Sequence, residues 1–449
     1  MSSPPHRSGP STAPLSENRR IWAIAGPAII ANSSAPLVGL VDTWAIGHLP
    51  GAVYLAAVGV GATVFSYVFW AFGFMRMSTT GLVAQAHGRG DTDGLLKVVL
   101  RSLILGGLIA LSLIALQNLL FSASIAALAP PKEVAALYTD YFNIRIWSAP
   151  AVLFTYGISG YLIGVAKARA ALVLQLVLNI ANGGLNLLFV IGFGLGVKGI
   201  ALGSLIAEWA AALVGIAMLV AHFGRGQLRW TLVDAALWRV KNFAELAQTN
   251  GYIFVRTLLL MTALTLVTRE AGLIGENALA ASHIMTIFML LISLGLDAFA
   301  YAVEALAGAA YGKGARDTFR RWVRLTSLWA LLAASLYSVA FYMFGDGLIA
   351  SLTDVASVRR VAQETLPIII WLPLASVACY QFDGIFIGTT AAPAMMVTMF
   401  VSFLVFLAII GPLAASMGLK GLWLAVILFS ACRGLTQWVY YPAILRKLA

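Results

Sequence analysis

Long hydrophobic stretches separated by short polar segments recur along the chain. About 20 consecutive apolar residues are enough for an α-helix to cross a membrane, and the sequence offers twelve stretches of this kind. The pattern therefore predicts an all-α integral membrane protein with twelve transmembrane helices. Their expected ranges are residues 22–46, 52–82, 98–121, 142–165, 170–192, 199–221, 246–269, 278–310, 325–345, 366–388, 394–412 and 421–443.

An internal repeat relates the two halves of the chain. Residues 81–90, GLVAQAHGRG, reappear 224 positions later as residues 305–314, ALAGAAYGKG, and Gly160 matches Gly384 at the same separation. Two repeats of this length in an apolar chain are typical of secondary transporters, whose substrate sites lie between the halves. Since six spans return each half to its starting side, we expect parallel repeats about an axis normal to the membrane.

Two polar segments lie outside the spans. The first 20 residues are rich in Ser and Pro and lack the apolar core and cleavage pattern of a signal peptide, so we expect a disordered tail. The longest polar stretch between spans joins the halves and is expected to form in part a short amphipathic surface helix. The expected organisation is a cytoplasmic tail at 1–20, an N-lobe at 21–221, a cytoplasmic linker at 222–245 and a C-lobe at 246–445.

The composition agrees with a membrane location. Hydrophobic residues make up 61% of the chain and charged residues 10%, whereas soluble domains carry about 25% charged residues. Lys and Arg are concentrated in the loops of one predicted side, nineteen against six, which predicts that both termini are cytoplasmic in a plasma or inner membrane. This bias accounts for the net charge of +11, so the basic loops are expected to contact anionic membrane lipid rather than nucleic acid.

Several kinds of chemistry have no signature in the sequence. Cys379 and Cys432 fall inside predicted spans without a CxxC pair, and the five histidines are scattered, so neither a disulfide nor a metal site is indicated. No phosphate-binding GxxxxGK[ST] loop occurs. An intramembrane enzyme would need a nucleophile beside a base, and no such spacing is visible. We therefore expect a protein that is not an enzyme, uses no cofactor and draws its energy from an ion gradient.

Eight charged residues inside the predicted spans stand out, because a charge there costs about 2.5–3.5 kcal/mol unless it finds a partner, a water-filled cavity or a proton. Arg76 and Arg433 lie toward the cytoplasmic ends of their helices and are expected to extend to the interface. Glu208 suits either an inward-facing carboxyl group or a structural hydrogen bond. The eight are Asp42, Arg76, Glu208, Arg256, Asp297, Glu304, Asp383 and Arg433.

Asp42 is the outstanding acid of the first half. Asn179, Asn182 and Asn186 follow at spacings of three and four residues, which places their amides on one face of the fifth span. If the first and fifth helices meet, these amides could hydrogen-bond the carboxyl group in either protonation state, so that it binds and releases a cation. The alternative is that the three amides only hold helices together.

The second half carries a different group of charges. Asp297 and Glu304 are two helical turns apart and share a face of the eighth span, with Asp383 and Arg256 as available partners. Arg256 could pair with one carboxylate and leave another to titrate or to hold a cationic substrate. The alternative is a static ion network that fixes the packing of this half.

Four sequence runs, taken together, resemble the MATE (multidrug and toxic compound extrusion) transporters, and among them the DinF branch. The resemblance covers residues of roughly 20 to 445. It implies two six-helix lobes around a central cleft, and export of a substrate in exchange for protons or sodium ions. The runs are VDTWAIGHL at 41–49, RMSTTGL at 76–82 followed by Gln85-Ala86, LDAFAYAVEA at 296–305, and FDGIFIG at 382–388.

The resemblance also suggests roles for residues. In similar proteins an acid on the first helix is the main coupling residue, which here is Asp42. Members of the branch often carry a second acid at the position that Asn186 occupies here. Because the Asn186 amide cannot titrate, the resemblance leaves Asp42 as the main candidate for the coupling residue. Its expected helpers are Asn179, Asn182, Asn186, Tyr141 and Ser204. Other branches use second-lobe acids for sodium, so a secondary C-lobe site is Arg256, Asp297, Glu304 and Asp383.

The expected function is multidrug efflux by a proton antiporter that works by alternating access, as a monomer, on small amphipathic cationic compounds. One alternative is sodium coupling through the C-lobe acids. Another is a flippase for lipid-linked precursors, which would need a strongly cationic central cavity, whereas the second half shows three acids against one central arginine. Flexible Met and aromatic side chains are expected to line the cleft: Phe65, Phe69, Met75, Met285, Phe288 and Met289.

Overall fold

The computed structural model of the protein describes residues 16–47, 49 and 51–448, and every regular element in this part of the chain is a helix. Most of the predicted tail at 1–20 lies outside the described residues, and the first helix begins at Glu17. The predicted all-α class is confirmed. Eleven helices or helix pairs are long and apolar enough to span a membrane, and a bent pair at Ala356–Gly388 makes twelve within the described residues.

The first half contains nine α-helices in the described chain. Helices α2 and α3 form one span, as do α6 and α7, and α5 is a short extra helix after α4. The predicted third span therefore runs too far, because α4 ends at Ala115. The bounds are α1 (Glu17–Gly47), α2 (Ala52–Ala71), α3 (Phe74–Arg89), α4 (Thr92–Ala115), α5 (Gln117–Leu128), α6 (Lys132–Arg145), α7 (Ala149–Gly164), α8 (Ala168–Leu187) and α9 (Gly196–Phe223).

The second half follows a short helix, α10, which lies inside the predicted linker. Helices α14 and α15 form one span that bends by 57°. The bounds are α10 (Arg225–Val233), α11 (Val240–Ile274), α12 (Glu276–Gly312), α13 (Arg316–Leu352), α14 (Ala356–Ile369), α15 (Leu372–Gly388), α16 (Ala392–Met417) and α17 (Leu419–Arg446).

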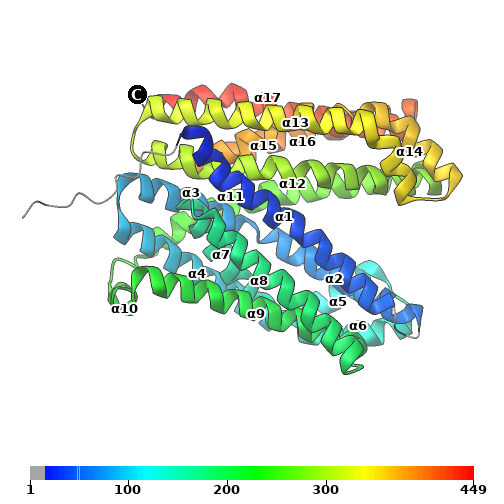
Figure 1. Ribbon diagram of the computed structural model, residues 1–449, viewed down its shortest axis with the longest axis horizontal. Helices are drawn as coiled ribbons and strands as arrows, with labels where there is room; N and C mark the ends of the chain where they lie inside the picture. Colours follow the sequence, from blue (N-terminus) through cyan, green and yellow to red (C-terminus); the bar gives the residue numbers. More distant parts are fainter. Residues whose placement is uncertain (1–15, 48, 50, 449) are drawn as a thin grey trace, which may run out of the picture.

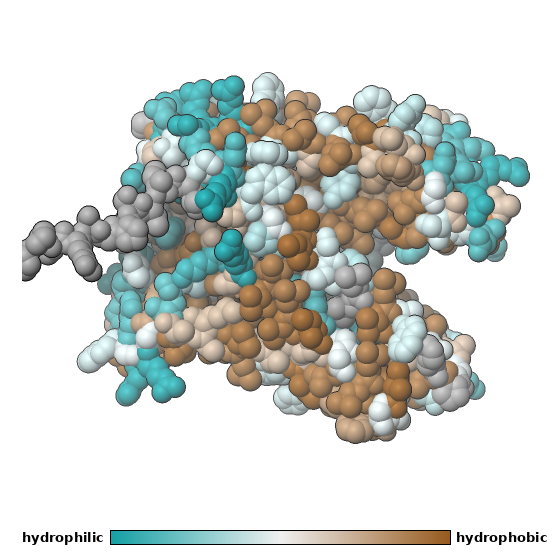
Figure 2. Space-filling model, in the orientation of Figure 1, coloured by the Kyte–Doolittle hydropathy of each residue, from teal (hydrophilic) through white to brown (hydrophobic). Residues whose placement is uncertain are grey.

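Two lobes are visible in Figure 1, with most helices of the first half below and those of the second half above. Helix α1 begins and α17 ends at the same end of the molecule, at the left of the view, which we call the terminal end. Figure 2 shows a hydrophobic belt between more polar ends, as expected for a protein that crosses a membrane. It also shows a notch between the lobes at the opposite end, so the lobes part there.

The repeat is visible in how each lobe packs. A Cβ atom added to Gly160 of α7 would lie 2.6 Å from the carbonyl oxygen of Arg76 in α3. A Cβ atom on Gly384 of α15 would lie 2.7 Å from the carbonyl oxygen of Ala300 in α12. Both pairs are separated by the same 224 positions. The matched glycines therefore allow the same close helix contact in each lobe.

The repeated segment itself joins the lobes at the terminal end. A Cβ atom on Gly88 of α3 would lie 1.9 Å from the carbonyl oxygen of Ala309 in α12, and one on Gly312 of α12 would lie 2.2 Å from that of Gln85 in α3. The two contacts are exchanged by the repeat, since Gln85 matches Ala309 and Gly88 matches Gly312. A pseudo-two-fold axis therefore passes between α3 and α12, as parallel repeats require.

Helix α1 crosses between the lobes. Near its start, the Trp22 ring lies 5.6 Å from that of Phe299 in α12 and 5.3 Å from that of Trp329 in α13. Farther along, Ser34 and Asp42 accept hydrogen bonds from α8 in the first lobe. Since α1 contains two prolines, which weaken a helix at fixed points, this helix can bend between its two sets of contacts.

Candidate functional site

A cavity of about 610 Å³ lies in the first lobe. Its wall comes from α1, α2, α3, α6, α7, α8 and α9, with Tyr301 of α12 added from the other lobe. Side chains with aromatic rings and amides share this wall, so the cavity offers apolar faces beside hydrogen-bonding groups. Among them are Asn32, Phe69, Trp70, Tyr156, Asn182 and Tyr301.

Asp42 is connected to this cavity by a chain of hydrogen bonds. The Nδ2 atom of Asn186 donates to Asp42 Oδ1 at 2.6 Å and to Asn182 Oδ1 at 2.9 Å. Asn182, which lines the cavity, donates in turn to Ser204 Oγ at 2.9 Å. Asp42 is half-buried, whereas Asn186 is fully buried. A change of charge on Asp42 therefore reaches the cavity wall through two side chains.

Two other expected helpers lie farther from the carboxyl group. Asn179 Nδ2 donates to Ser34 Oγ at 2.6 Å and its Oδ1 accepts from Gln175 at 3.0 Å, so it faces α1 about two turns away from Asp42. The Tyr141 hydroxyl interacts with Arg145. The structure thus links Asn186, Asn182 and Ser204 in series to Asp42, and gives Asn179 and Tyr141 other partners.

Arg145 was not singled out from the sequence. Its Nη1 and Nη2 atoms donate to Glu208 Oε2 and Oε1, both at 2.6 Å, and it also contacts Ser148. Both charged side chains line the cavity and are only 11% and 12% exposed. A two-bond arginine–carboxylate pair is strong and directional, so Glu208 is held in an ion pair. The signal available in the sequence was an arginine inside an apolar span.

Arg76 joins the two lobes instead of extending to the interface as expected. Its Nη1 atom lies 3.1 Å from Glu304 Oε2 in α12, and its guanidinium lies 4.5 Å from the centre of the Tyr301 ring. Arg76 also lines the cavity. The reason is that α3 packs against α12 of the other lobe, which places the buried Glu304 carboxylate within reach of Arg76.

The C-lobe charges form a separate cluster. Asp383 accepts from Arg433 at 2.7 Å and from Gln437 at 2.6 Å, and it also contacts Arg256. Arg433, too, is therefore paired rather than directed to the interface. In the described part of the chain Asp297 makes no hydrogen bond or ion pair. Of the four residues of the secondary site, Arg256 and Asp383 meet, while Glu304 pairs with Arg76.

The six expected cleft residues are mostly in the hydrophobic cores. Phe69 lines the cavity. Met75 lies against Gly106, and Phe288 packs at 4.7 Å from the ring of Phe341. The remaining members pack in or against the same cores: Phe65 in the first lobe, and Met285 and Met289 in the second. Composition alone does not say which side of a helix faces a cavity, so the roles of these residues as substrate contacts stay predictions.

Across residues 16–448, apart from the two undescribed positions, no group of three or more His, Cys, Asp or Glu side chains is close enough together to hold a metal ion.

Comparisons with known proteins agree with this architecture. The MatE family model matches residues 27–188 and 253–413, once in each half. DNA damage-inducible protein F of Escherichia coli K12 is 36% identical over 429 residues, which cover 94% of this chain and 91% of that protein. Protein DETOXIFICATION 44 of Arabidopsis thaliana is 26% identical over 92% of this chain and 80% of its own length.

The fold is also similar to solved structures. The crystal structure of the Vibrio cholerae MATE transporter VcmN in the bent form has a TM-score of 0.83 at 22% identity, over 96% of this chain and 97% of that one. An outward-facing multidrug resistance MATE family transporter has a TM-score of 0.82 at 19% identity, over 96% of each chain. At this identity the likeness concerns the fold.

Proposed function

The chain belongs to the MATE family of multidrug and toxic compound efflux transporters, and to its DinF branch, and on this premise we propose that it exports amphipathic organic compounds in exchange for protons. The observation that carries the proposal is the hydrogen-bonded chain from Asp42 through Asn186 to Asn182 in the cavity wall. It offers a direct path by which a proton on Asp42 changes the binding surface for a substrate.

The proposed cycle follows from the two states of Asp42. Ionised Asp42 accepts the amide hydrogen of Asn186 and fixes both asparagines in the arrangement that the substrate meets. Protonated Asp42 is neutral and can donate, so the asparagines reorient and the binding surface changes. Removing a charge from the membrane interior also lowers the cost of moving this helix. Proton and substrate would thus occupy the first lobe in turn.

The proposed orientation places both termini in the cytoplasm of a plasma or inner membrane. It rests on the excess of Lys and Arg in the loops of the terminal end. The notch of Figure 2 would then face outward, with α3 and α12 closing the cytoplasmic side. A membrane potential of 100 mV is worth about 2.3 kcal/mol per charge, so one proton would sustain a gradient of roughly fifty-fold for a neutral substrate.

We propose lipophilic cations as the first substrates to test. We also propose that a single chain transports them as a monomer. The support is the aromatic wall, since Trp70 and Tyr156 offer ring faces that attract cations. The C-lobe acids give little support for a cationic substrate, because Glu304 and Asp383 are neutralised by arginines.

The two alternatives have less support. Sodium coupling in the C-lobe would need several oxygen ligands around one ion, but the carboxylates there are separated and two of them already bind arginine. A precursor flippase would need a strongly cationic cavity. Among the described residues of the cavity wall, Arg145 is neutralised by Glu208, and Arg76 is bound to Glu304.

The test is efflux of a fluorescent lipophilic cation from proteoliposomes, with a pH gradient and a sodium gradient imposed separately. We expect the pH gradient to drive efflux by the native chain and to fail with Asp42→Asn. Asp297→Asn is the matched control, because it makes the same change outside the hydrogen-bonded chain. Efflux that needs sodium, survives Asp42→Asn and is lost in Asp297→Asn would contradict the proposal.

A further inference from the structure

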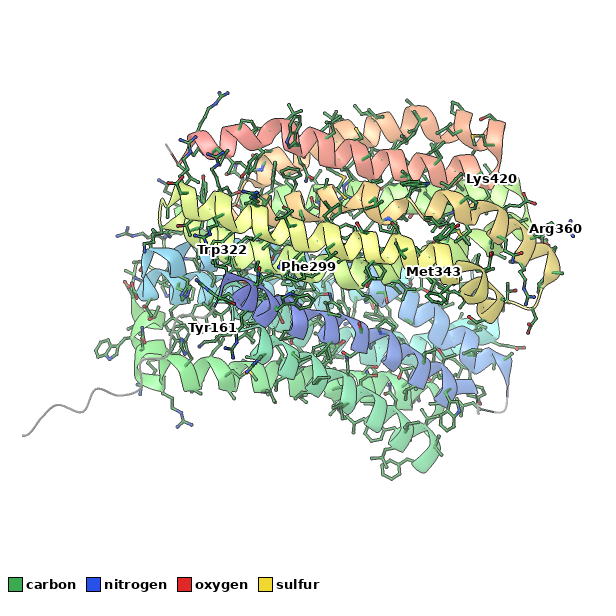
Figure 3. All side chains as sticks on the ribbon, turned by 45° about the horizontal axis from the view of Figure 1, so that its top comes forward. Tyr161, Phe299, Trp322, Met343, Arg360 and Lys420 are labelled. Atoms are coloured by element: carbon green, nitrogen blue, oxygen red, sulfur yellow. The ribbon has the colours of Figure 1, made fainter. Side chains whose placement is uncertain are left out.

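A second cavity, of about 260 Å³, lies between the lobes at the terminal end. Helix α3 supplies His87 and Gly88 to its wall, and α12 supplies Ala309 and Lys313. Arg20 of α1 and Trp322 of α13 complete the side toward the second lobe. Figure 3 shows Trp322 at this end of the molecule, far from Arg360 and Lys420 at the other. The cavity is separate from the larger cavity and shares no lining residue with it.

The wall is cationic. Arg20, His87 and Lys313 line it, and none of its described lining residues is an Asp or a Glu. Within the described chain, neither Arg20 nor Lys313 forms an ion pair. Arg20 is instead held over the Trp322 ring at 4.8 Å. Glu17, one turn earlier on α1, is engaged by Arg321 at 2.8 Å. Like charges that converge without a counter-ion repel, so an anion would stabilise this arrangement.

The chemistry of the wall suits a phosphate group. Guanidinium and ammonium groups are the usual partners of phosphate oxygens in proteins, and the Thr318 hydroxyl in the same wall can add a hydrogen bond. Basic pockets between helices on the cytoplasmic side bind the head groups of anionic lipids. The cavity is about nine times the ~30 Å³ that a water molecule occupies in the liquid, so it has room for more than ordered water.

We propose that this cavity binds an anionic phosphate group, either the head group of an anionic lipid or a free phosphate. Because His87 belongs to the first lobe and Lys313 to the second, the bound phosphate bridges the lobes beside the contacts of Gly88 and Gly312. It thereby stabilises the closed state of the terminal end. This consequence for the transport cycle rests on the proposed alternating-access function, whereas the binding itself does not.

Native mass spectrometry of the full chain tests the binding. The protein is titrated with phosphatidylglycerol, with phosphatidylcholine, and with inorganic phosphate in phosphatidylcholine. We expect Arg20→Gln with Lys313→Gln to weaken binding of the first phosphatidylglycerol about 25-fold, from about 1 kcal/mol for each basic residue. Arg225→Gln with Arg229→Gln removes the same charge from α10, outside the cavity, and should leave that binding nearly unchanged.

The three titrations distinguish a lipid head group from a free phosphate as the bound anion. Tight binding of phosphatidylglycerol that the cavity pair weakens identifies a lipid head group, and binding of inorganic phosphate with the same dependence identifies a free phosphate. Equal losses in the two variant pairs would overturn the proposal, because they would show general attraction to a basic surface. Equal binding of phosphatidylcholine and phosphatidylglycerol, with no binding of inorganic phosphate, would also overturn it.

Amide hydrogen exchange tests the bridge. In nanodiscs that contain phosphatidylglycerol, we expect residues 86–92 and 309–316 to exchange several-fold more slowly than in phosphatidylcholine alone. The difference should vanish in the Arg20→Gln and Lys313→Gln pair. If the lipid binds but these segments exchange at unchanged rates, the bound phosphate does not bridge the lobes. Exchange is measured without substrate, so its result is independent of whether the chain proves to be a proton antiporter.

Discussion

At the residue scale, two carboxylates near the first-lobe cavity are held in different ways. Glu208 accepts two bonds of 2.6 Å from Arg145. Asp42 accepts from the neutral amide of Asn186. The guanidinium holds Glu208 in a directional two-bond ion pair, whereas an amide can hydrogen-bond either form of a carboxyl group after reorienting. Of the two, Asp42 is therefore the one suited to gain and lose a proton during a cycle.

Removing the amide of Asn186 should uncouple Asp42 from the cavity. A hydrogen bond to a charged group contributes about 1.5–3 kcal/mol, so we expect Asn186→Ala to slow proton-driven efflux by about tenfold or more. The measurement is the initial rate in proteoliposomes. Asn179→Ala is the control, because Asn179 contacts Ser34 and Gln175 rather than Asp42. Equal losses in the two variants would speak against the hydrogen-bonded chain.

The Arg145–Glu208 pair should matter for stability. Removing one partner of a buried ion pair costs about 3–5 kcal/mol, because the other charge stays buried alone, so Glu208→Gln should lower the thermal unfolding midpoint clearly. Asp140→Asn breaks the exposed pair with Lys198, at 3.4 Å, and should change stability by about 1 kcal/mol or less. Equal thermal unfolding midpoints for the two variants would show that the unpaired Arg145 guanidinium is hydrated and not buried without a partner.

At the element scale, the linker is fastened to the first lobe. Arg101 of α4 donates to the carbonyl oxygens of Ala236 and Leu237 at 2.7 and 2.9 Å, and Lys97 lies 2.6 Å from Asp234. The segment after α10 therefore moves with α4. If the lobes move relative to each other, the chain has to change its conformation after this segment, where α11 begins at Val240.

Asp234 makes this attachment sensitive to pH. The hydrogen bond from Lys97 lowers the pKa of Asp234 below its usual range, so its contribution is present at neutral pH and is lost as the pH falls below about 4. Asp234→Asn should speed tryptic cleavage of the linker at pH 7.5. Pepsin at pH 2 should cut the native chain and the variant at similar rates. A native linker cut as fast as the variant at neutral pH would show that the attachment is unimportant.

The close contact of α3 and α12 gives a second test at this scale. A side chain on Gly88 would collide with the Ala309 carbonyl, so Gly88→Val should separate the helices and expose the terminal end. We expect faster labelling of a cysteine placed at Ala84 by a water-soluble reagent, and slower transport. Gly226→Val, at a position with open space around it, is the control. Unchanged labelling would mean that the lobes do not close through this contact.

At the scale of the whole molecule, the structure combines two matched lobes with unequal chemistry. The glycines at 160 and 384 build the same packing twice, but the acid at 42 is matched by Leu266 in the second half. The larger cavity likewise lies in the first lobe. The repeat thus supplies a frame that can rock about its axis, and the first lobe supplies the group that we propose to couple this motion to protons.

Much of this frame could be predicted from the sequence, because span length and the 224-residue repeat are properties of the chain itself. Helical spacing also places Asn179, Asn182 and Asn186 on one face, but it does not say that this face meets Asp42. The partners of Arg76 and Arg145 did not follow from the sequence, since they depend on how helices are rotated about their axes. For the same reason Met75 and Phe288 were expected in a cleft and are buried in the cores.

The most direct test of the account is simultaneous measurement of substrate and proton movement in one proteoliposome preparation. With a pH-sensitive dye inside and a fluorescent cation as substrate, antiport predicts that substrate added outside enters the vesicles while protons leave the lumen, toward the side of addition. The proton signal should disappear with Asp42→Asn while the protein stays folded. Substrate movement without any proton signal in the native chain, or an unchanged proton signal in Asp42→Asn, would contradict the assignment of Asp42 as the coupling residue.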